Sequence, residues 1–525
     1  MIQTLTAPYR QRSLMPKVST DRCMSSATPM SEIPGVVARC RATFRKGALR
    51  TIDQRKAALR QLKLLLEEHE VALCDALKAD LGKSHYEAMA TEVLLVKTDV
   101  IHALDHLSSW AKPTPADREG IQLLDPARIH HDPFGACLII GAWNYPVQLV
   151  LLPLVGALSG GNTVVVKPSE VSPHTAALLA KLLPTYFSNG IVQVVLGAVA
   201  ETSALLEAKW DHIFYTGSGA VGRIVATAAA KHLTPVTLEL GGKSPCIVDE
   251  TANVDVAARR IMWGRFMNAG QTCIAPDYLL VHPAVKAQLI QSLRTARDEF
   301  MGPDPKACTD YARIVNERHF ERVRKLLAFG TIVVGGEIDA ATNFIAPTVL
   351  DKVAVDSPLM TEEIFGPLLP IVEFRTADEA INFVNDRDKP LALYVFSTRK
   401  DFIKRVLDET TAGGVTINDT LMHTSVAGLP FGGVGPSGCG CYHGKHSFDN
   451  YTHRKAVLVK NPGLERVNRV RYPPYSPWKL SVLKAVMAKS KERGPVSLST
   501  IVAIGALAFA GRYAWNWWSA QHGAL

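Results

Sequence analysis

The sequence predicts an α/β protein in which a parallel sheet is covered by helices on both faces. Short apolar runs rich in β-branched residues alternate with longer stretches of helical periodicity, and this alternation is typical of parallel strands buried between two helical layers. With 525 residues, the chain is long enough for two or three domains. The strand-like runs are 136–140, 163–166, 191–196, 212–215, 236–238 and 246–248, and helical stretches such as 175–183 and 222–232 separate them.

The segments around this core are predicted from composition and periodicity. Residues 1–30 carry four basic side chains and one acidic side chain among many serines and threonines, which favours a disordered extension over a mitochondrial presequence of similar composition. Residues 51–81 and 84–111 have apolar side chains at helical spacing. A second α/β stretch runs from about 250 to 425.

The composition is that of an ordinary globular protein, with 47% hydrophobic and 20% charged residues. The nine cysteines show no framework spacing, which predicts free thiols in a reducing compartment. Cys439 and Cys441 form the one close pair, and no second pair matches it, so we predict no metal site.

Basic residues gather near the C-terminus and supply much of the net charge of +9. A Pro-rich linker at 472–478 and an amphipathic helical stretch at 479–493 come before a largely apolar segment at 495–518, which ends in an aromatic cluster. Aromatic rings at the end of an apolar segment favour a membrane anchor over a nucleic-acid contact, and a buried or interfacial helix is the alternative. Lysines on the N-terminal side of this anchor predict that the body of the protein is cytosolic.

Two residues predict covalent catalysis. Cys273 follows a short glycine-containing loop, and Glu239 ends an apolar run just before a glycine turn. A cysteine thiolate can attack a carbonyl carbon, and a carboxylate can later activate water to release the acyl group. This pairing in a nucleotide-binding α/β chain indicates an aldehyde substrate and a nicotinamide as electron acceptor.

A glycine pattern predicts where a dinucleotide binds. Gly217, Gly219 and Gly222 follow a strand-like run and open a helix-like segment, a context in which backbone N–H groups face a diphosphate. The acid that binds ribose is expected about 20 positions later, which is Glu239. Glu170, beside Lys167 at the end of an earlier strand, is the other candidate, so the residues alone leave open which acid is free for catalysis.

Two further candidate segments lie in predicted loops. Attack on a carbonyl places negative charge on its oxygen, and donors must be positioned there. Asn144 lies just after a strand and can supply an amide N–H, although a simple turn asparagine is the alternative. The run that contains Glu363 and Phe365 has the composition of a surface turn.

These motifs, in this order, resemble the aldehyde dehydrogenase superfamily over about 40–460. The details around Cys273 and the run from Pro430 to Phe448 resemble its class 3, fatty-aldehyde branch, and the apolar tail is similar to that of membrane-bound fatty aldehyde dehydrogenases. The matching segments are Ala142-Trp143-Asn144-Tyr145-Pro146, Lys167-Pro168-Ser169-Glu170, Thr216-Gly217-Ser218 with Val221-Gly222, Glu239-Leu240-Gly241-Gly242-Lys243, Gly270-Gln271-Thr272-Cys273 and Glu363-Ile364-Phe365-Gly366-Pro367.

The resemblance implies catalytic roles and settles the conflict over Glu239. The glutamate that matches Glu239 is the general base of this family, and Cys273 matches the nucleophile. Asn144 and the backbone N–H of Cys273 would form the oxyanion hole.

The resemblance also implies how NAD is held, with NADP accepted as well. Lys167 and Glu170 match residues that hold the adenosine ribose, and Glu170 would repel a 2′-phosphate. Glu363 would bind the nicotinamide ribose. Ser218, between Gly217 and Gly222, would contact the diphosphate, and Trp143 and Phe365 complete the cofactor-binding set, with Phe365 near the nicotinamide.

The family fold implies a Rossmann-like cofactor domain, an α/β catalytic domain, a bridging arm and here a C-terminal membrane helix. Members of class 3 are typically dimers, so we expect a homodimer. We divide the chain into a disordered extension (1–30), an NAD-binding domain (31–111 and 132–240), a catalytic domain (241–425), a bridging and closing part (112–131 and 426–460), a linker with an amphipathic helix (461–493) and a membrane anchor (495–518).

The expected function is the NAD(P)-dependent oxidation of long-chain or other lipophilic aldehydes to carboxylic acids, through a thiohemiacetal and a thioester on Cys273. An apocarotenal is an equally lipophilic alternative substrate. A CoA-acylating dehydrogenase is a second alternative, and Glu239 argues against it because such relatives commonly lack that base. Among membranes, the endoplasmic reticulum is favoured.

Overall fold

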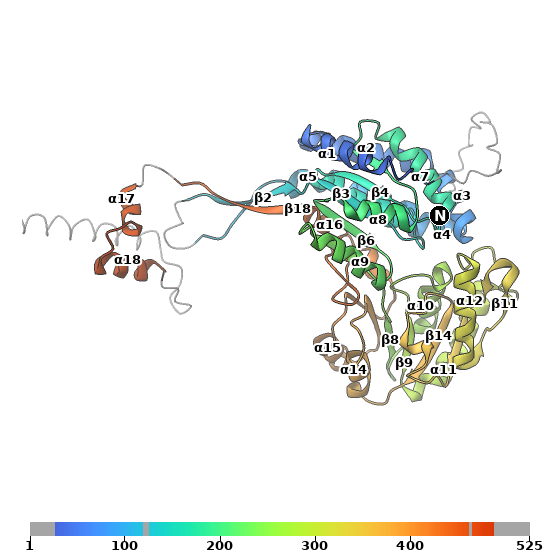
Figure 1. The fold of residues 1–525 in the computed structure, drawn as a ribbon. Helices are drawn as coiled ribbons and strands as arrows, with labels where there is room; N and C mark the ends of the chain where they lie inside the picture. The colour runs from blue at the N-terminus through green and yellow to red at the C-terminus, as the bar shows by residue number, and fades with distance from the viewer. Residues whose placement is uncertain (1–26, 119–124, 461–464, 488–525) are drawn as a thin grey trace, which may run out of the picture.

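The computed structural model describes residues 27–118, 125–460 and 465–487. Two sheets form the body, and a long arm projects from it (Figure 1). The first sheet has the order β17-β7-β6-β3-β4-β5 and is parallel except for β17. Its strands are β3 (Ala136–Ile140), β4 (Thr163–Lys167), β5 (Val192–Val194), β6 (His212–Thr216), β7 (Val236–Glu239) and β17 (Gly438–Cys439).

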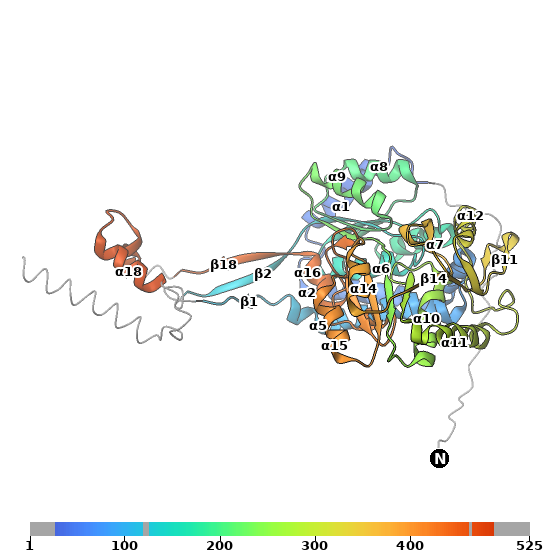
Figure 2. The same ribbon diagram turned by 90° about the horizontal axis from the view of Figure 1, so that it is seen from below.

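Helices cover both faces of this sheet, as buried apolar strands require. One face is covered by α2, α3, α5, α6 and α7, and the other by α1, α8 and α9, which Figure 2 shows on the opposite side of the body from α2 and α5. The helices are α1 (Ile33–Arg45), α2 (Ile52–Glu68), α3 (Glu70–Leu81), α5 (Leu94–Trp110), α6 (Gln148–Gly160), α7 (Pro173–Tyr186), α8 (Val199–Glu207) and α9 (Gly219–Ala230).

Helix α6 is apolar on all sides, and every residue from Leu149 to Gly160 is buried. A helix without a polar face is stable only inside the protein. α6 meets this condition because it lies between the first sheet, α2, α5 and α16 (Gly444–Asn450). The loop that precedes α6 contains Asn144, so a rigid and fully buried element supports that loop.

The second sheet has the order β10-β13-β14-β9-β8-β15-β16, and only its β10–β13 pair is antiparallel. α10 (Val254–Phe266), α11 (Pro283–Met301) and α12 (Glu317–Leu326) cover one face, and α14 (Ala377–Asn385) and α15 (Lys400–Glu409) cover the other. The strands are β8 (Pro245–Val248), β9 (Tyr278–Val281), β10 (Thr331–Val334), β13 (Thr348–Asp351), β14 (Leu368–Glu373), β15 (Ala392–Phe396) and β16 (Gly414–Ile417).

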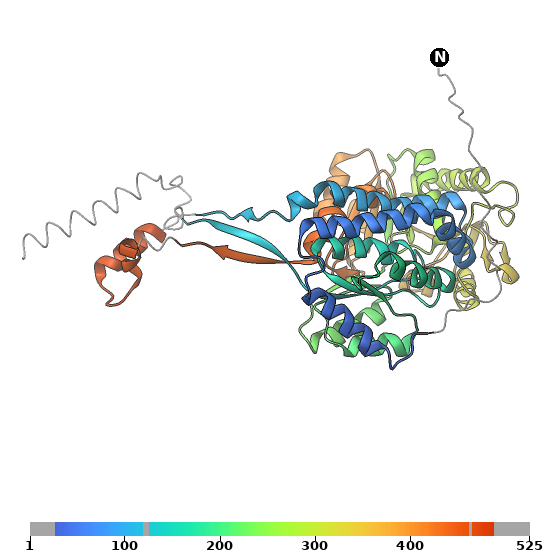
Figure 3. The ribbon, with the colours of Figure 1, turned by 90° about the horizontal axis from the view of Figure 1, so that it is seen from above.

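The arm is a three-stranded antiparallel sheet of β1 (Thr114–Pro115), β2 (Ala127–Pro133) and β18 (Thr452–Leu458). It extends away from the body, as all views show (Figures 2 and 3). The short helix α17 (Glu465–Asn468) and α18 (Pro477–Met487) lie at its far end. The amphipathic helix predicted at 479–493 thus begins two residues earlier, and its part beyond 487 lies outside the described residues.

Several predicted elements differ in detail from the structure. The predicted helix at 51–81 is two helices, because His69 between α2 and α3 leaves helical geometry at ψ 20°. The predicted helix at 84–111 begins as α4 (His85–Ala88), passes through a π-helical turn over Met89–Val93 and continues as α5. The strand predicted at 191–196 shortens to β5.

The predicted N-terminal extension falls mostly outside the described residues, but its last residues are ordered. Thr28 N donates to Leu196 O at 2.9 Å, and Leu196 N donates to Thr28 Oγ1 at 2.9 Å. Disorder up to residue 30 was therefore a wrong prediction, because pairing beside β5 satisfies this backbone.

The membrane anchor predicted at 495–518 also lies outside the described residues. Within the described part of the chain, no helix combines the length and the apolar character needed to span a membrane. Of the nine cysteines, the eight that the structure describes are free, as predicted. The described residues contain no cluster suited to a metal ion.

Candidate active site

The candidate site lies at the carboxyl ends of the first sheet's strands. β3 is central, with β4 on one side and β6 on the other, so the loops after β3 and β6 diverge. Such a switch point opens a crevice that holds ligands in open α/β sheets. Asn144 lies in the loop after β3, Gly217 follows β6, and Glu239 ends β7.

Cys273 lies between α10 and β9, in the part of the chain that forms the second sheet and its helices and is called here the second domain. The loop before it has an unusual backbone geometry. Asn268, Ala269 and Gly270 have positive φ values of 53°, 51° and 74°. Left-handed geometry costs roughly 1–2 kcal/mol for a residue with a β-carbon, although asparagine tolerates it better. A strained turn of this kind, which here ends three residues before Cys273, persists only where the surrounding structure determines it.

Gly270 also brings this loop against the loop of Glu363. A β-carbon at Gly270 would lie 2.3 Å from the carbonyl oxygen of Gly366. Arg265 donates to the same carbonyl at 2.5 Å. The two loops are therefore in direct backbone contact, and the close approach requires glycine.

The thiol of Cys273 is partly buried against the apolar core of the second domain. Burial raises its pKa above the ordinary value, and the nearby carboxyl groups of Glu363 and Glu239 raise it further. The backbone N–H groups of Cys273 and Ile274 act in the opposite direction. The thiol is thus neutral near pH 7 in this state, and any nucleophilic reaction must remove its proton.

Glu239 is 2% exposed, and neither carboxyl oxygen has a hydrogen-bond partner among the described residues. Burial raises its pKa well above the ordinary 4.5. A buried carboxyl group without a partner costs stability, and such groups concentrate at functional sites. The carboxyl group of Glu239 is close enough to raise the pKa of the Cys273 thiol electrostatically. The two residues therefore lie near each other although they come from different domains.

Asn144 is 3% exposed, and its side chain joins the two domains. Its Nδ2 donates to Gln271 O at 3.0 Å, two residues from Cys273. Next to it, Tyr145 Oη lies 2.6 Å from Thr272 Oγ1. An amide NH₂ group has two hydrogens, so the one not used by Gln271 can serve a ligand oxygen beside the thiol.

The loop of Glu363 and Phe365 is not the surface turn that its composition suggests. Glu363 lies against the backbone of Gly241, where an added β-carbon would be 2.1 Å from Glu363 Oε2. Burial, with Asp277 as the next cause, raises the pKa of Glu363 to about 8. The surrounding loop is fixed by buried or half-buried cations: Lys243 donates to Glu362 O, Arg265 to Gly366 O, and Arg322 to Ile364 O.

The residues present fit a dinucleotide. Glu363 Oε1 is buried without a hydrogen-bond partner in the described structure, which leaves an acceptor for a ligand hydroxyl. The ring of Phe365 meets that of Trp143 edge to face, with 5.2 Å between the ring centres, and the two rings form an apolar contact. At the end of β4, Lys167 Nζ lies 2.6 Å from Glu170 Oε2, and both side chains carry groups that can hydrogen-bond hydroxyl groups.

The glycine pattern also has the expected context. Ser218 is the N-cap of α9 and accepts from Val221 N at 3.4 Å. Gly217 has φ 158°, and a β-carbon at Gly222 would lie 2.8 Å from Leu240 Cδ2, so Gly222 allows α9 to approach the sheet closely. The positive end of α9 can therefore face a diphosphate.

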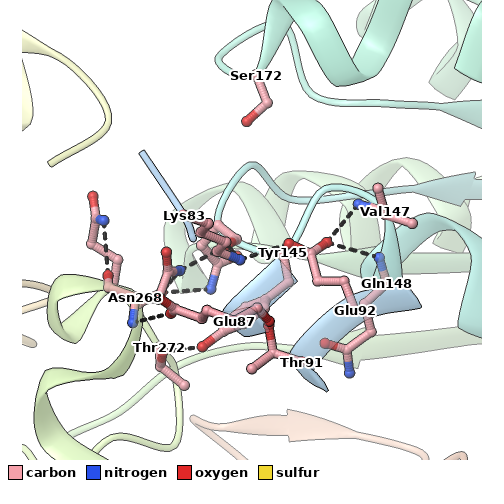
Figure 4. A network of polar contacts seen from close by, with 12 residues as sticks. Lys83, Glu87, Thr91, Glu92, Tyr145, Val147, Gln148, Ser172, Asn268 and Thr272 are labelled. Carbon is pink, nitrogen blue, oxygen red and sulfur yellow. Dashed lines mark hydrogen bonds and ion pairs between the residues drawn. The ribbon is translucent and has the colours of Figure 1, made fainter. Parts of the chain in front are cut away.

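The structure thus brings Cys273 near Glu239 and Glu363, and Asn144 contacts the cysteine loop. Lys167 and Glu170 lie at the end of β4, and Ser218 begins α9 after β6. Sequence reasoning missed a buried set of polar residues behind this site. Figure 4 shows this set, which includes Lys83, Glu87, Glu92 and Asn268. The sequence contained a signal for this set, because Lys83, Glu87 and Glu92 lie in or next to the helical segment 84–111, whose apolar residues are spaced for burial.

The chain was compared with known proteins. A model described as the aldehyde dehydrogenase family matches residues 12–457. Aldehyde dehydrogenase family 3 member A2 of Rattus norvegicus is 49% identical over 472 residues, which cover 90% of this chain and 98% of the relative. A second Rattus norvegicus protein, named aldehyde dehydrogenase, dimeric NADP-preferring, is 48% identical over 86% of this chain and 99% of its own length. A solved structure described as the substrate-bound state of Staphylococcus aureus AldH has a TM-score of 0.85 and 44% identity, over 87% of this chain and 99% of that one.

Gly270→Ala is expected to lower the free energy of unfolding, measured by urea denaturation. Its β-carbon would meet both the left-handed φ and the carbonyl of Gly366. Gly435→Ala is the matched control, because Gly435 has φ 62° but no atom within 4 Å of the added carbon. The control should lose about 1–2 kcal/mol, and Gly270→Ala should lose more. Equal losses would contradict the tight contact between the two loops.

Proposed function

The chain belongs to the aldehyde dehydrogenase family and is an NAD(P)-dependent aldehyde dehydrogenase, and on that premise we propose that its substrates are long-chain or other lipophilic aldehydes, oxidised through a thioester on Cys273. The observation that carries the mechanism is the meeting of a thiol, an amide donor and an unpartnered buried carboxyl group at one crevice.

In the first half of the proposed reaction, the proton of the Cys273 thiol passes to water, and Sγ forms a bond to the aldehyde carbon as the carbonyl π bond breaks. The aldehyde oxygen takes up negative charge, which the free amide hydrogen of Asn144 and the backbone N–H of Cys273 stabilise. Glu363, Phe365 and Trp143 would hold the nicotinamide of NAD(P), which would supply the acceptor for the aldehyde hydrogen and its electron pair. Cys273 then carries the thioester.

The cofactor residues follow the crevice. Glu363 and the rings of Phe365 and Trp143 would hold the nicotinamide half. Ser218 and the N-terminus of α9 would face the diphosphate, and Lys167 with Glu170 would bind the adenosine ribose. The acid at Glu170 disfavours a 2′-phosphate, so we propose NAD as the main cofactor with NADP accepted.

In the second half, Glu239 takes a proton from water, which attacks the thioester and releases the carboxylic acid. Its buried carboxyl group, which has no hydrogen-bond partner among the described residues, supports this role, because buried acids with perturbed pKa values concentrate at functional sites. The same residue argues against transfer of the acyl group to CoA, which needs no water-activating base.

The proposed substrate class rests on the C-terminal segment. An apolar stretch with a terminal aromatic cluster at 495–518 would anchor the enzyme in a bilayer, where long-chain aldehydes concentrate. We propose a cytosolic catalytic body on the endoplasmic reticulum and a homodimer; the word "dimeric" in the name of one relative supports the latter. An apocarotenal would satisfy the same chemistry.

Cys273→Ala is expected to abolish NADH formation, because it removes the proposed nucleophile that carries the thioester. The measurement is NADH absorbance with saturating aldehyde and NAD, with circular dichroism to verify folding. Cys308→Ala, which removes a half-buried thiol from the loop between α11 and α12, should retain full activity. Substantial turnover by Cys273→Ala would refute the nucleophile assignment.

The hydrolytic half should depend on pH through Glu239. Because burial raises the pKa of this carboxyl group above 4.5, it is protonated and inactive at pH values where a free glutamate would already be a base. The rate of thioester hydrolysis should therefore fall as the pH is lowered through this raised pKa. Glu239→Gln should lose hydrolysis at every pH yet still form one equivalent of NADH. If Glu239→Gln hydrolysed the thioester with the same dependence on pH as the wild type, the assignment of Glu239 as the base would be contradicted.

The substrate class is tested with a panel of aldehydes that runs from short aliphatic through long-chain to aromatic and apocarotenoid. The ratio kcat/KM should rise with chain length, since each buried methylene adds about 0.8 kcal/mol of transfer free energy. A chain that ends at residue 494 should leave the membrane fraction on centrifugation. A preference for short aldehydes would overturn the substrate proposal and leave the chemistry standing.

A further inference from the structure

A buried polar cluster behind the site has no part in the reaction as written above. Its charged members are Lys83 and Glu92, which are fully buried, and Glu87, which is 8% exposed (Figure 4). Removing three charges from water is costly unless their contacts compensate. The contacts of this cluster therefore indicate what it does.

Lys83 holds the loop of Asn144. Its Nζ lies 2.6 Å from Glu92 Oε1, donates to Asn144 O at 3.1 Å and sits 3.9 Å above the centre of the Tyr145 ring. Lys83 thus contacts both Asn144 and Tyr145, the two residues whose side chains bond to the Cys273 loop.

Glu92 holds the same segment from its other end. Its Oε2 accepts from Val147 N at 2.8 Å and from Gln148 N at 3.1 Å, at the start of α6. Those amides have no partner within the helix, and a carboxylate is favourable at a helix N-terminus. Lys83 and Glu92 together fix the chain at Asn144 and at the start of α6.

Glu87 holds the cysteine loop. Its Oε1 accepts from Asn268 N at 2.6 Å. Asn268 is the first of the three left-handed residues, and its Nδ2 donates to Asn144 O at 2.8 Å and to Gln271 O at 3.1 Å. The carboxyl group of Glu87 therefore anchors the turn at the point where its strain begins.

The π-helical turn over Met89–Val93 explains how both acids face inward. Residues five apart on an α-helix point about 140° away from each other. A π-turn contains more residues per turn, so Glu87 and Glu92 come closer to one face. Such turns occur frequently at functional sites, and here the turn aims one acid at each of the two loops.

We propose that Lys83 and Glu87 are positioning residues that set the oxyanion hole of this enzyme, Lys83 by fixing Asn144 and Glu87 by fixing the Asn268 turn that leads to Cys273. The inference rests on the proposed function of Asn144 and Cys273. Neither Lys83 nor Glu87 needs to contact the aldehyde or NAD. Their effect should appear in the rate of the chemical step and not in the binding of either ligand.

The test measures NADH formation in a single turnover of the full-length enzyme, with saturating NAD and aldehyde. Glu87→Ala and Lys83→Met should lower this rate on the order of ten- to a hundredfold, because a displaced donor loses alignment with the developing charge. The KM values for aldehyde and NAD should change by about twofold at most.

Conservative variants separate positioning from folding. Glu87→Gln keeps an acceptor oxygen for Asn268 N–H and should retain most of the rate. Glu87→Asp keeps the acid but draws the oxygen back by one methylene, so its rate should fall between those of Glu87→Gln and Glu87→Ala. If Glu87→Ala does not fold, the ordering of the other two variants still decides.

Lys97→Met is the matched control, because Lys97 forms its 3.0 Å ion pair with Glu67 on the outer side of the same helical segment. It should keep the wild-type rate. Wild-type single-turnover rates in Glu87→Asp and Lys83→Met, whatever their thermal stability, would overturn the proposal. Failure of the proposed function is a separate result, since it would appear as NADH formation by Cys273→Ala.

Discussion

The hydrogen bond from Asn144 to the carbonyl of Gln271 is the contact on which the site depends, because it joins two domains that have separate cores. The apolar clusters of the first sheet contain no residue of the second sheet. The nucleophile lies on a loop of one domain and the proposed oxyanion donor on a loop of the other. This 3.0 Å hydrogen bond fixes the positions of the two loops relative to each other before any ligand binds.

The buried carboxyl groups around the site differ in whether a cation pairs with them. Asp277 is held by Lys243 at 2.6 Å and Arg265 at 3.0 Å, and it supports the Glu363 loop. Glu239 has no partner among the described residues and keeps a raised pKa. A paired buried acid is typical of a structural role, whereas an unpaired buried acid costs stability and is typical of a functional site.

The first sheet is extended by a segment from the far end of the chain. β17 pairs with β7 so that Gly438 is opposite Glu239, and Leu240 N donates to Ser437 O at 3.1 Å. A β-carbon at Gly438 would lie 2.1 Å from Leu238 O, so the close pairing requires glycine. The backbone around the proposed base is thereby fixed on both sides, although its carboxyl group remains free.

Local patterns in the sequence were sufficient for the α/β class, for the parallel strands of the first sheet to within a few residues, and for the candidate groups of the site, because strand periodicity, glycine turns and a thiol in a short loop are local features. The edge strand β17, the burial of Glu363 and the contacts of Lys83 and Glu87 with the Asn144 and Asn268 loops became visible only in the folded chain. These contacts join residues 61 and 181 positions apart. The physical reason is that a charged side chain within a helix is usually solvated, so local patterns cannot distinguish it from one that packing has removed from water.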